Sequence, residues 1–473
     1  MSISNFYQDQ EIFVTGGTGF IGKVLVEKIL RSLPNISKLY ILIRSKKNQT
    51  PEDRLKKLLE IPVFRRVHTE QPESFRKIIP IAGDCCEKEL GISTQDKERL
   101  HNVSIIFHVA ATVRFDENLK TAILLNTRGA YEMVKLAQGM PKLKAFVHVS
   151  TTYAHPDIKV LDEKIYPPYG DWRHIIKLAE TYDVETLNTL RSKIAPNHPN
   201  NYTFTKSLAE HVIDDHRHTL PVVILRPSIV ISSYEEPIPG WIDNFNGPIG
   251  MLVACGIGVL RTNYGNPNIV PDIIPVDMVA KSILVAAFKL GTNPPTLCPN
   301  TDLEIFNCCN SSKRYLSTSD IVDIGKKTIL KIPFEKCIWL PEGGITASFV
   351  WHYFRFITQQ ILPAMILDLL LIVAGQKPVL LRIHRRMEST IQILKVFLNT
   401  EWTFLNDNLR ALQNIISEEE RSTFNFLDYC DCDQMLYYLN TTRGAKEFLL
   451  KENPVPSRGA ILRIRIFRCR NVR

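Results

Sequence analysis

Short apolar runs alternate with helix-periodic segments along the first 230 residues of the chain. The runs are rich in β-branched residues and nearly continuous, which is typical of strands buried on both faces of a sheet. They are EIFVTG, KLYILIR, KIIPIAG, SIIFHVA, KAFVHVS and PVVILRP, and the helices expected between them include 20–33, 118–138 and one after Asn201. This alternation predicts an α/β fold, a doubly wound parallel sheet covered by helices on both faces.

Changes in composition indicate how the rest of the chain is organised. Residues 233–275 are rich in Pro, Gly and Asn, so we expect an insertion there that shapes a pocket. Pro and Asn cluster again at 291–301, one more strand and a helix at 320–329 follow, and the later pattern is helical. The sequence therefore predicts a first domain of residues 1–300, a connecting segment of 301–345 and a smaller helical domain of 346–473.

Composition restricts the class of protein and of ligand. Of the 473 residues, 45% are apolar and 23% are charged, which predicts a globular protein and excludes collagen, coiled coil and general disorder. The net charge of +9 favours anionic ligands or an anionic membrane surface, but it is spread too thinly to indicate nucleic acid. The ten cysteines form no C-x-x-C pair, so no metal site is expected. The first residues lack a secretory pattern, so we expect a protein that is not secreted, with reduced thiols.

The strongest motif is Thr15-Gly16-Gly17-Thr18-Gly19-Phe20-Ile21-Gly22, which follows the first strand and opens the first helix. In that context the first glycine permits a tight turn, the second lets backbone N–H groups approach a pyrophosphate, and the third lets helix and strand pack closely. The residues from Gly17 also spell G-x-x-x-x-G-K, but Val24 offers no hydroxyl for Mg²⁺. A dinucleotide site is therefore favoured over a triphosphate loop or a purely structural turn.

Basic residues follow the second strand, where an NAD enzyme would present Asp or Glu to the ribose. The chain has Arg44, Lys46 and Lys47 there, which suits a 2′-phosphate and favours NADP(H). A solvated Lys-rich loop is the alternative for the lysines. Asp84, at the end of the third strand, is either an adenine contact or a turn residue.

Tyr202 and Lys206 are four residues apart on an expected helix and therefore share one face. A nearby cation favours the phenolate, so this pair can relay a proton to a carbonyl oxygen that receives hydride. The strand KAFVHVS ends at Ser150 and Thr151, whose hydroxyls are expected at the ligand-facing edge of the sheet. The sequence predicts that these polar groups converge on one substrate.

With these motifs the chain resembles the extended short-chain dehydrogenase/reductases, and among them the alcohol-forming fatty acyl-CoA reductases, over nearly its whole length. The segments that carry the resemblance include TGGTGFIGKVLVEKIL, LIRSKK, HVAATVRFDE, HVSTTYAH, KVLDEKIYPP, LRPSIV, EEPIPGWIDNFNGP and IIPVDMV. Beyond residue 301, ILPAMILDLLLIVAGQKPVLLRIHRRM, EWTFLNDN and SEEERSTFNFLD resemble the male-sterility-type C-terminal domain of that family. Residues 1–300 would then be an NADP(H)-binding reductase domain.

The resemblance implies roles for single residues. Thr151 matches the carbonyl-orienting hydroxyl, with Ser150 as an alternative, Tyr202 matches the acid and Lys206 its modulator. Cofactor contacts are implied for the glycine turn, for Tyr202 and Lys206 themselves, and for Arg44, Lys46, Asp84, Ala110, Ala111, Asn126 and Pro227. Asn126 matches a water-holding residue, although an ordinary helix residue would look the same.

The implied function is the reduction of long-chain fatty acyl-CoA to fatty alcohol by NADPH, in two hydride transfers through a bound aldehyde. A nucleotide-sugar oxidoreductase or epimerase, and a non-catalytic NADP-binding scaffold at a lipid membrane, are the alternatives. The apolar run 361–375, broken by Pro363 and Asp368, is expected as an interfacial or a buried helix and not as a clean membrane span. A C-terminal segment with six arginines would suit an anionic leaflet or a solvated end. We therefore expect membrane association, at the peroxisome or endoplasmic reticulum, with no indication of oligomeric state.

Overall fold

The computed structural model describes residues 1–46, 48–293, 302–310 and 316–471. The chain forms two compact units, and each is built from three chain segments. Unit 1 comprises 1–230, 273–312 and 403–430, and unit 2 comprises 231–272, 313–402 and 431–473. Most of the expected insertion 233–275 contributes to unit 2, and 403–430 returns to unit 1, which differs from the linear division expected above. Most of the boundary expected at 291–301 lies outside the described residues.

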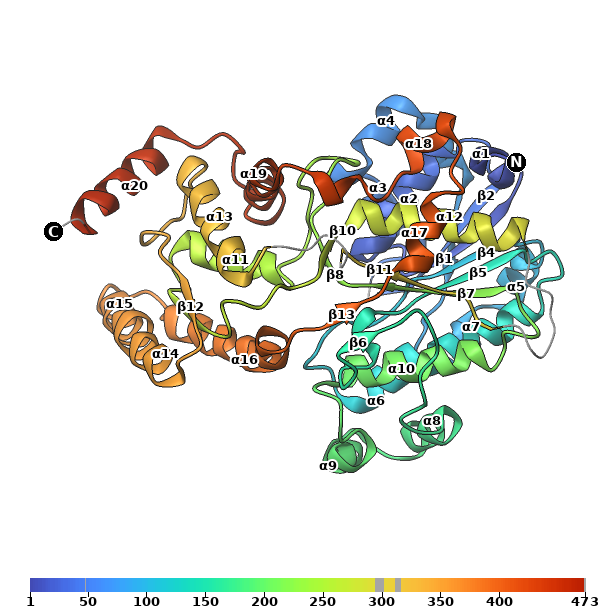
Figure 1. Cartoon of the computed structure of the whole chain (residues 1–473), viewed down its shortest axis with the longest axis horizontal. Coiled ribbons are helices and arrows are strands. Elements are labelled where there is room, and N and C mark those ends of the chain that lie inside the picture. The colour runs from blue at the N-terminus through green and yellow to red at the C-terminus, as the bar shows by residue number, and fades with distance from the viewer. Residues whose placement is uncertain (47, 294–301, 311–315, 472–473) are drawn as a thin grey trace. The chain divides into compact units, whose positions relative to one another are not determined.

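A seven-stranded parallel sheet forms the centre of unit 1 (Figure 1). Its strand order is β11-β7-β5-β4-β1-β2-β3, and most of the strand residues are buried. The strands are β1 (Glu11–Thr15), β2 (Lys38–Ile43), β3 (Ile78–Ala82), β4 (Ile105–His108), β5 (Ala145–Val149), β7 (Val222–Pro227) and β11 (Ile305–Cys308). The six predicted apolar runs and the one further strand expected after residue 301 are these seven strands, which confirms the doubly wound α/β fold.

Helices cover both faces of this sheet. On one face α2 (Phe20–Ser32) packs against α12 (Val276–Thr292), and on the other α7 (Gly129–Gln138) packs against α10 (Asn201–Asp214) (Figure 1). Strand β1 lies between β2 and β4, so the strand order reverses there. In such sheets the crevice at the carboxyl ends of the strands at this point is the usual ligand site.

Shorter elements complete unit 1. The predicted helix 118–138 is α6 (Leu119–Ala122), a π-helical turn (Ile123–Arg128) and α7 in succession. Two short strands, β6 (Val160–Leu161) and β13 (Thr403–Phe404), pair in parallel, and β8 (Ile229–Ile231) pairs with β10 (Ile273–Pro275). The other helices are α1 (Ile3–Tyr7), α3 (Pro51–Leu59), α4 (Arg65–Glu70), α5 (Thr94–Leu100), α8 (Trp172–Thr181), α9 (Val184–Ile194), α17 (Asp407–Gln413) and α18 (Glu418–Phe424).

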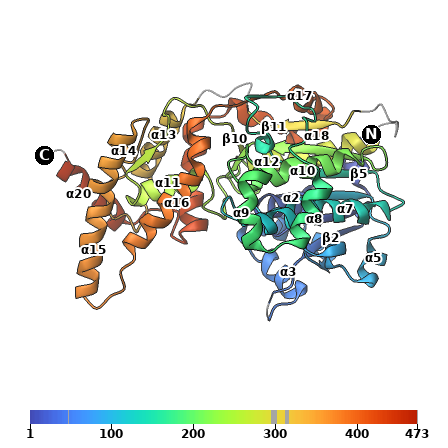
Figure 2. The ribbon, with the colours of Figure 1, turned by 90° about the horizontal axis from the view of Figure 1, so that it is seen from below.

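Unit 2 is mostly helical. Its helices are α11 (Pro248–Ile257), α13 (Thr318–Lys331), α14 (Phe349–Phe356), α15 (Leu362–Val373), α16 (Leu380–Asn399), α19 (Gln434–Gly444) and α20 (Arg458–Asn471). Two short strands, β9 (Thr262–Tyr264) and β12 (Gly344–Thr346), pair within it. Helices α15 and α16 lie side by side (Figure 2). Asp368 of α15 joins them, because its carboxylate accepts three N–H bonds, each of 2.9 Å, from residues 379–381 at the start of α16.

One helix among the described residues is long and apolar enough to cross a membrane, judged by length and composition. It runs over 25 residues, Phe349–Val373, and includes α14, a π-helical turn and α15. It is longer than the run 361–375 because the helix continues back through Gln359 and Gln360 to Phe349. Few of its side chains are buried, which is unlike the core helix of a soluble domain.

Candidate active site

The turn between β1 and α2 allows an unusually close approach of backbone to backbone. Gly16 has a φ of +74°, and a Cβ on it would lie 2.6 Å from the backbone nitrogen of Ala110. A Cβ on Gly22 would collide with the carbonyl oxygen of Gly16. Helix α2 starts at Phe20, and Gly19 before it supplies no side-chain cap, so the positive end of the helix dipole faces the turn without a capping side chain. Thr18 lies in this turn and Ile21 in the first turn of α2, an arrangement that fits a dinucleotide pyrophosphate.

The loop after β4 is held beside this turn. The Thr15 hydroxyl lies 2.7 Å from Nδ1 of His108 and accepts an N–H bond of 3.3 Å from Ala110. Burial lowers the pKa of His108 to about 3, and the Lys206 charge adds to this, so the imidazole is neutral. The small residues Ala110 and Ala111 thus lie next to the glycine turn, where we expect the dinucleotide to bind.

The basic residues after β2 face an acid after β3. Arg44 forms an ion pair of 3.6 Å with Asp84, and more than half of the arginine side chain is exposed. Asp84 also accepts an N–H bond from Cys86, so it is a turn residue as well as an ionic partner. Lys46 is exposed and pairs with Gln49 through the backbone, whereas Lys47 lies outside the described residues. The position expected to contact the ribose therefore carries a positively charged side chain, Arg44, and a negatively charged one, Asp84.

Helix α10 carries the predicted acid and its modulator. Asn200 caps the helix by accepting an N–H bond of 2.9 Å from Thr203. The buried Lys206 donates from Nζ to the Val149 carbonyl at 2.6 Å. Burial lowers the pKa of Lys206 to about 8, and the negative charge of Glu210 opposes this. Burial raises the pKa of Tyr202 to about 12, and the hydrogen bond with Thr151 opposes this. A cation one turn away is expected to favour the phenolate, but burial has the larger effect on this pKa and the phenol stays protonated at neutral pH.

Thr151, directly after β5, is the hydroxyl that the structure brings to Tyr202. Besides this contact it accepts an N–H bond from Tyr153 and donates to the Pro227 carbonyl at 3.4 Å, at the end of β7. The amide of Ser150 donates to Leu225 at 2.7 Å, and its buried hydroxyl has no protein partner among the described residues. Of the two candidate hydroxyls, that of Thr151 contacts Tyr202 and therefore fits the carbonyl-orienting role better than that of Ser150.

Asn126 lies in the π-helical turn before α7 and binds the protein itself. Its Oδ1 accepts an N–H bond of 2.9 Å from Thr112, and its Nδ2 donates to the Thr205 hydroxyl at 2.9 Å. These bonds connect the loop after β4 to α10. Asn126 therefore has a positioning role in this structure, in addition to the cofactor or water contact that the resemblance implies.

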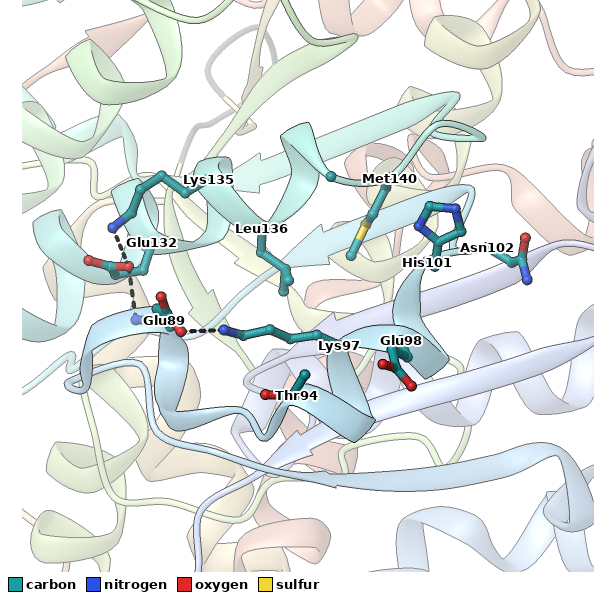
Figure 3. A pocket seen from close by; sticks show the side chains of 11 residues that line it. Glu89, Thr94, Lys97, Glu98, His101, Asn102, Glu132, Lys135, Leu136 and Met140 are labelled. Carbon is teal, nitrogen blue, oxygen red and sulfur yellow. Dashed lines mark hydrogen bonds and ion pairs between the residues drawn. The ribbon is translucent and has the colours of Figure 1, made fainter.

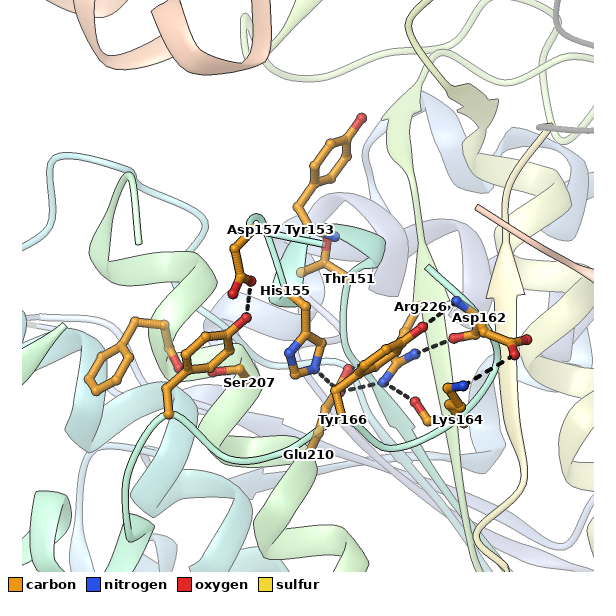
Figure 4. A network of polar contacts seen from close by, with 12 residues as sticks. Thr151, Tyr153, His155, Asp157, Asp162, Lys164, Tyr166, Ser207, Glu210 and Arg226 are labelled. Carbon is orange, nitrogen blue, oxygen red and sulfur yellow. Dashed lines mark hydrogen bonds and ion pairs between the residues drawn. The ribbon is translucent and has the colours of Figure 1, made fainter. Parts of the chain in front are cut away.

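Several residues near the site were not foreseen as functional. The ring of Phe115 lies 5.7 Å from that of Tyr202. Glu210, one turn after Lys206, forms a buried ion pair with Arg226, and His155 lies 3.3 Å from its Oε2 (Figure 4). The sequence carried only one sign of this network, the spacing of Glu210 four residues after Lys206, because its other members come from distant segments.

A hollow in unit 1 lies at the amino ends of the strands, away from the glycine turn. It has a volume of about 650 Å³ and is lined by residues that precede β4 and β5, among them His101 and Met140 (Figure 3). Its lysines are paired within the wall, Lys97 with Glu89 and Lys135 with Glu132. This hollow therefore does not include the glycine turn or Tyr202, which belong to the carboxyl ends of the strands.

The fold and the site together define a class of protein. A parallel doubly wound sheet, a glycine turn at its switch point, and a Tyr, Lys and Thr at the same edge are the features of an extended short-chain dehydrogenase/reductase. Such a site binds a nicotinamide dinucleotide, and when bound this cofactor supplies or accepts hydride. The glycine turn fits it, because side chains at Gly16 and Gly22 would fill the cradle.

Comparisons with known proteins narrow the class. Two family models, both described as male sterility protein, match residues 14–283 and 359–452, and the first of them is an NAD-binding model. Fatty acyl-CoA reductase 1 of Xenopus laevis is 36% identical over 453 residues, covering 96% of this chain and 87% of that protein. Fatty acyl-CoA reductase wat of Drosophila melanogaster is 37% identical over 450 residues, covering 95% and 86%. The chain belongs to the fatty acyl-CoA reductase family.

Solved structures agree on the fold. The reductase domain of a nonribosomal peptide synthetase from Mycobacterium tuberculosis superimposes with a TM-score of 0.60 at 18% identity, covering 94% of this chain and 93% of that one. The terminal reductase domain of the myxalamid pathway gives 0.59 at 16%, covering 95% and 93%. At these identities the likeness concerns the fold alone.

Proposed function

We propose that this protein reduces long-chain fatty acyl-CoA to fatty alcohol with two molecules of NADPH, and that unit 1 carries the chemistry. The observation that carries the proposal is the meeting of Tyr202, Thr151 and Lys206 at the sheet edge that also holds the glycine turn. Family membership supports the substrate class. Each turnover would consume two hydrides and two protons and release coenzyme A.

The side chains fit both reduction steps. When hydride reaches the thioester carbonyl, Tyr202 and Thr151 can donate hydrogen bonds to the oxygen as it becomes negative. Collapse of the resulting hemithioacetal breaks the C–S bond, releases coenzyme A and leaves an aldehyde. In the second step Tyr202 gives its proton to the alkoxide, and the positive charge of Lys206 favours this transfer by stabilising the phenolate that remains. The high pKa of Tyr202 keeps the proton in place until it is needed.

The proposed reaction is tested with purified protein, NADPH and acyl-CoAs of several chain lengths. We expect fatty alcohol by chromatography, with two NADPH oxidised for each coenzyme A released and little free aldehyde. Stoichiometric free aldehyde would argue against a retained intermediate. UDP-sugars in place of acyl-CoA test the epimerase alternative, and turnover of UDP-sugars alone would overturn the proposal.

We propose NADPH rather than NADH as the reductant. Arg44 is exposed at the end of β2 and Lys46 lies close by in the chain, so both are available to a 2′-phosphate. Asp84 holds Arg44 through one ion pair, which leaves further guanidinium donors for the phosphate.

Replacement of Arg44 by Ala is expected to raise the KM for NADPH by about tenfold to a hundredfold, the loss of one charge-assisted phosphate contact. The KM for NADH should change little, because NADH has no 2′-phosphate. Steady-state kinetics with both cofactors measure this. Arg66→Ala, which removes another surface arginine of unit 1 with an i,i+4 ion pair, is the matched control. Equal losses for NADPH and NADH would contradict the assignment.

We propose that unit 2 attaches the protein to a membrane surface. Exposed apolar residues lie on most sides of α14 and α15, and they include Phe349, Trp351, Tyr353, Leu367 and Leu370. We call one broad face of them the apolar stripe, which comprises Val350, Phe354, Ile357, Leu362, Met365, Ile366, Leu369, Ile372 and Val373. Val373 is 80% exposed and Leu369 is 61% exposed, which is costly in water. Helix α16 folds back on α15 through Asp368 and carries Arg382, Arg385 and Arg386. This supports a hairpin lying in the interface with its arginines near anionic lipid headgroups.

The double substitution Ile366→Gln and Leu369→Gln is expected to weaken membrane binding by at least about tenfold, because burial of each side chain contributes roughly 1.5–3 kcal/mol. Cosedimentation with phosphatidylcholine vesicles containing phosphatidylserine measures it. The matched control is Val184→Gln with Ile415→Gln, two exposed apolar residues of unit 1. Undiminished sedimentation of the stripe variant would count against the hairpin. We propose the endoplasmic reticulum or the peroxisome as the home membrane, with the catalytic unit facing the cytosol or the peroxisomal side, which imaging of the tagged chain tests.

A further inference from the structure

A fully buried ion pair joins α10, the helix of Tyr202 and Lys206, to β7. Arg226, the fifth residue of β7, donates from Nε and Nη2 to the two carboxylate oxygens of Glu210 at 2.8 and 2.7 Å. Both side chains are 0% exposed. A bidentate pair in this environment has one defined geometry, because each N–H of the guanidinium fork has a fixed direction.

The same arginine also holds the chain around the site. Its remaining donors reach the carbonyls of Asp162 and Lys164 at 3.2 and 3.0 Å, in the segment after β6 (Figure 4). Pro227 follows Arg226 directly and accepts the hydroxyl of Thr151. One side chain thus connects α10, the end of β7 and the loop at 162–164, and the next residue contacts the orienting hydroxyl.

Glu210 lies on α10 at a spacing that lets its carboxylate interact with Lys206. The two are four residues apart and lie on one face of the helix, and both are buried. A charge one turn away in a buried setting is weakly screened. Burial alone would raise the pKa of Glu210, but Arg226 and His155 together hold that pKa below its usual range, so the carboxylate stays charged.

Other titratable groups around this pair come from several elements. Those that interact with Lys206 besides Glu210 are His108 of β4, His148 of β5 and Cys85 after β3. Those that interact with Glu210 besides Arg226 are His155, His148, Tyr169 and His211. Burial lowers the pKa of His108 to about 3 and that of His148 well below its usual value, so both are neutral. Glu210 is then the permanently charged anion in this set.

We propose that Glu210, locked by Arg226, is a positioning residue for the catalytic pair. Its carboxylate keeps Lys206 in the charged form, and its two bonds to Arg226 fix α10 against the end of β7, so that Tyr202 and Thr151 address the same carbonyl oxygen. This inference rests on the proposed function for its catalytic readout.

The central experiment is the pH dependence of kcat/KM for acyl-CoA in the wild type and in Glu210→Gln. Lys206, with a pKa of about 8, must be protonated to act, so activity is lost as the pH rises through that value. Removal of the Glu210 charge lowers the pKa of Lys206. The alkaline limb of the kcat/KM profile, the pH range in which activity falls as Lys206 loses its proton, should therefore move to lower pH by about one to two units. Glu132→Gln is the matched control, since it removes another buried carboxylate of unit 1, on α7. Its limb should not move.

A merely structural role would lower kcat and thermal stability without moving the limb. An unchanged limb in a folded and active Glu210→Gln protein, or an equal shift in Glu132→Gln, would therefore overturn the charge role. If Glu210→Gln does not fold, Glu210→Asp and Arg226→Lys keep the charges but lose part of the fork. For these we expect a lower kcat with the limb in place, and an unchanged kcat in both would overturn the positioning role.

The pH dependence of NADPH binding gives a second readout that needs no acyl-CoA, because Lys206 is placed at the cofactor. Fluorescence titration should show the same downward shift in Glu210→Gln. Absence of acyl-CoA turnover in the wild type, with this shift present, would count against the proposed substrate and not against Glu210. Turnover with no shift in either readout would count against Glu210 alone.

Discussion

Tyr202→Phe is expected to bind NADPH like the wild type and to reduce acyl-CoA about a hundredfold to ten-thousandfold more slowly, the usual contribution of a general acid. The substitution removes the phenolic oxygen and leaves the ring, which is half-buried and packs near Phe115. The helix should remain intact, because Asn200 caps it independently of Tyr202. Both hydride steps need a donor at the carbonyl oxygen, so kcat should fall for an aldehyde substrate as well as for the thioester.

The control for this prediction is Tyr182→Phe, which removes a phenol from an exposed residue of unit 1. It should leave kcat/KM within about twofold of the wild type, as surface substitutions usually do. Stopped-flow measurement of NADPH oxidation separates chemistry from product release. Near wild-type rates of Tyr202→Phe in a single turnover would show that Tyr202 is not the general acid, and Thr151 would then be the candidate donor.

The central sheet could be predicted from the sequence because its strands are almost purely apolar. Runs such as IIFH in β4 and AFVHV in β5 are buried on both faces, and in these places local composition and tertiary environment agree. The histidines within these runs are the informative exception. His108 and His148 lie on adjacent strands with ring centroids 5.3 Å apart, and local composition alone does not reveal that they meet next to Lys206.

The candidate site, like the sheet, could be predicted from the sequence only in part. The glycine turn follows from a local motif, and its geometry is confirmed by the φ of +74° at Gly16. The direction of the Tyr202 pKa shift could not be predicted, since it depends on how deeply neighbouring elements bury the phenol. The Glu210–Arg226 pair joins residues from α10 and β7, and the sequence shows the spacing of Glu210 from Lys206 but not that Arg226 lies against Glu210.

The two-unit organisation depends on long-range contacts that a linear pattern does not show. Residues 403–430 follow the helical segment in the chain, yet β13 pairs with β6 and the Asn408 side chain donates from Nδ2 to the Ile305 carbonyl at 3.1 Å. The Asn307 amide nitrogen also donates to the carbonyls of Leu161 and Leu405. Single asparagines therefore fix this return of the chain to unit 1, and composition gives no signal for them.

Gly22→Ala is expected to weaken NADPH binding by at least about tenfold and to lower the free energy of unfolding by about 1–3 kcal/mol, the usual cost of overpacking. A Cβ at this position would collide with the backbone carbonyl of Gly16 and approach Gly17 Cα at 2.7 Å. Backbone atoms cannot rotate away as a side chain can, so the turn itself must shift. Because the start of α2 is the expected pyrophosphate site, displacement of its first turn should disturb that site directly.

Fluorescence titration with NADPH and thermal unfolding with and without the cofactor measure the two effects of Gly22→Ala. Gly170→Ala is the matched control, because a Cβ there would meet only Ile175 Cγ1 at 3.9 Å, an ordinary contact. Bound NADPH should raise the Tm of the wild type and of the control, since a ligand of the folded state stabilises it, and should raise the Tm of Gly22→Ala much less. Equal ligand-induced shifts in all three proteins would mean that the dinucleotide binds away from this turn, and the assignment of the reductive chemistry to this edge of the sheet would then be wrong.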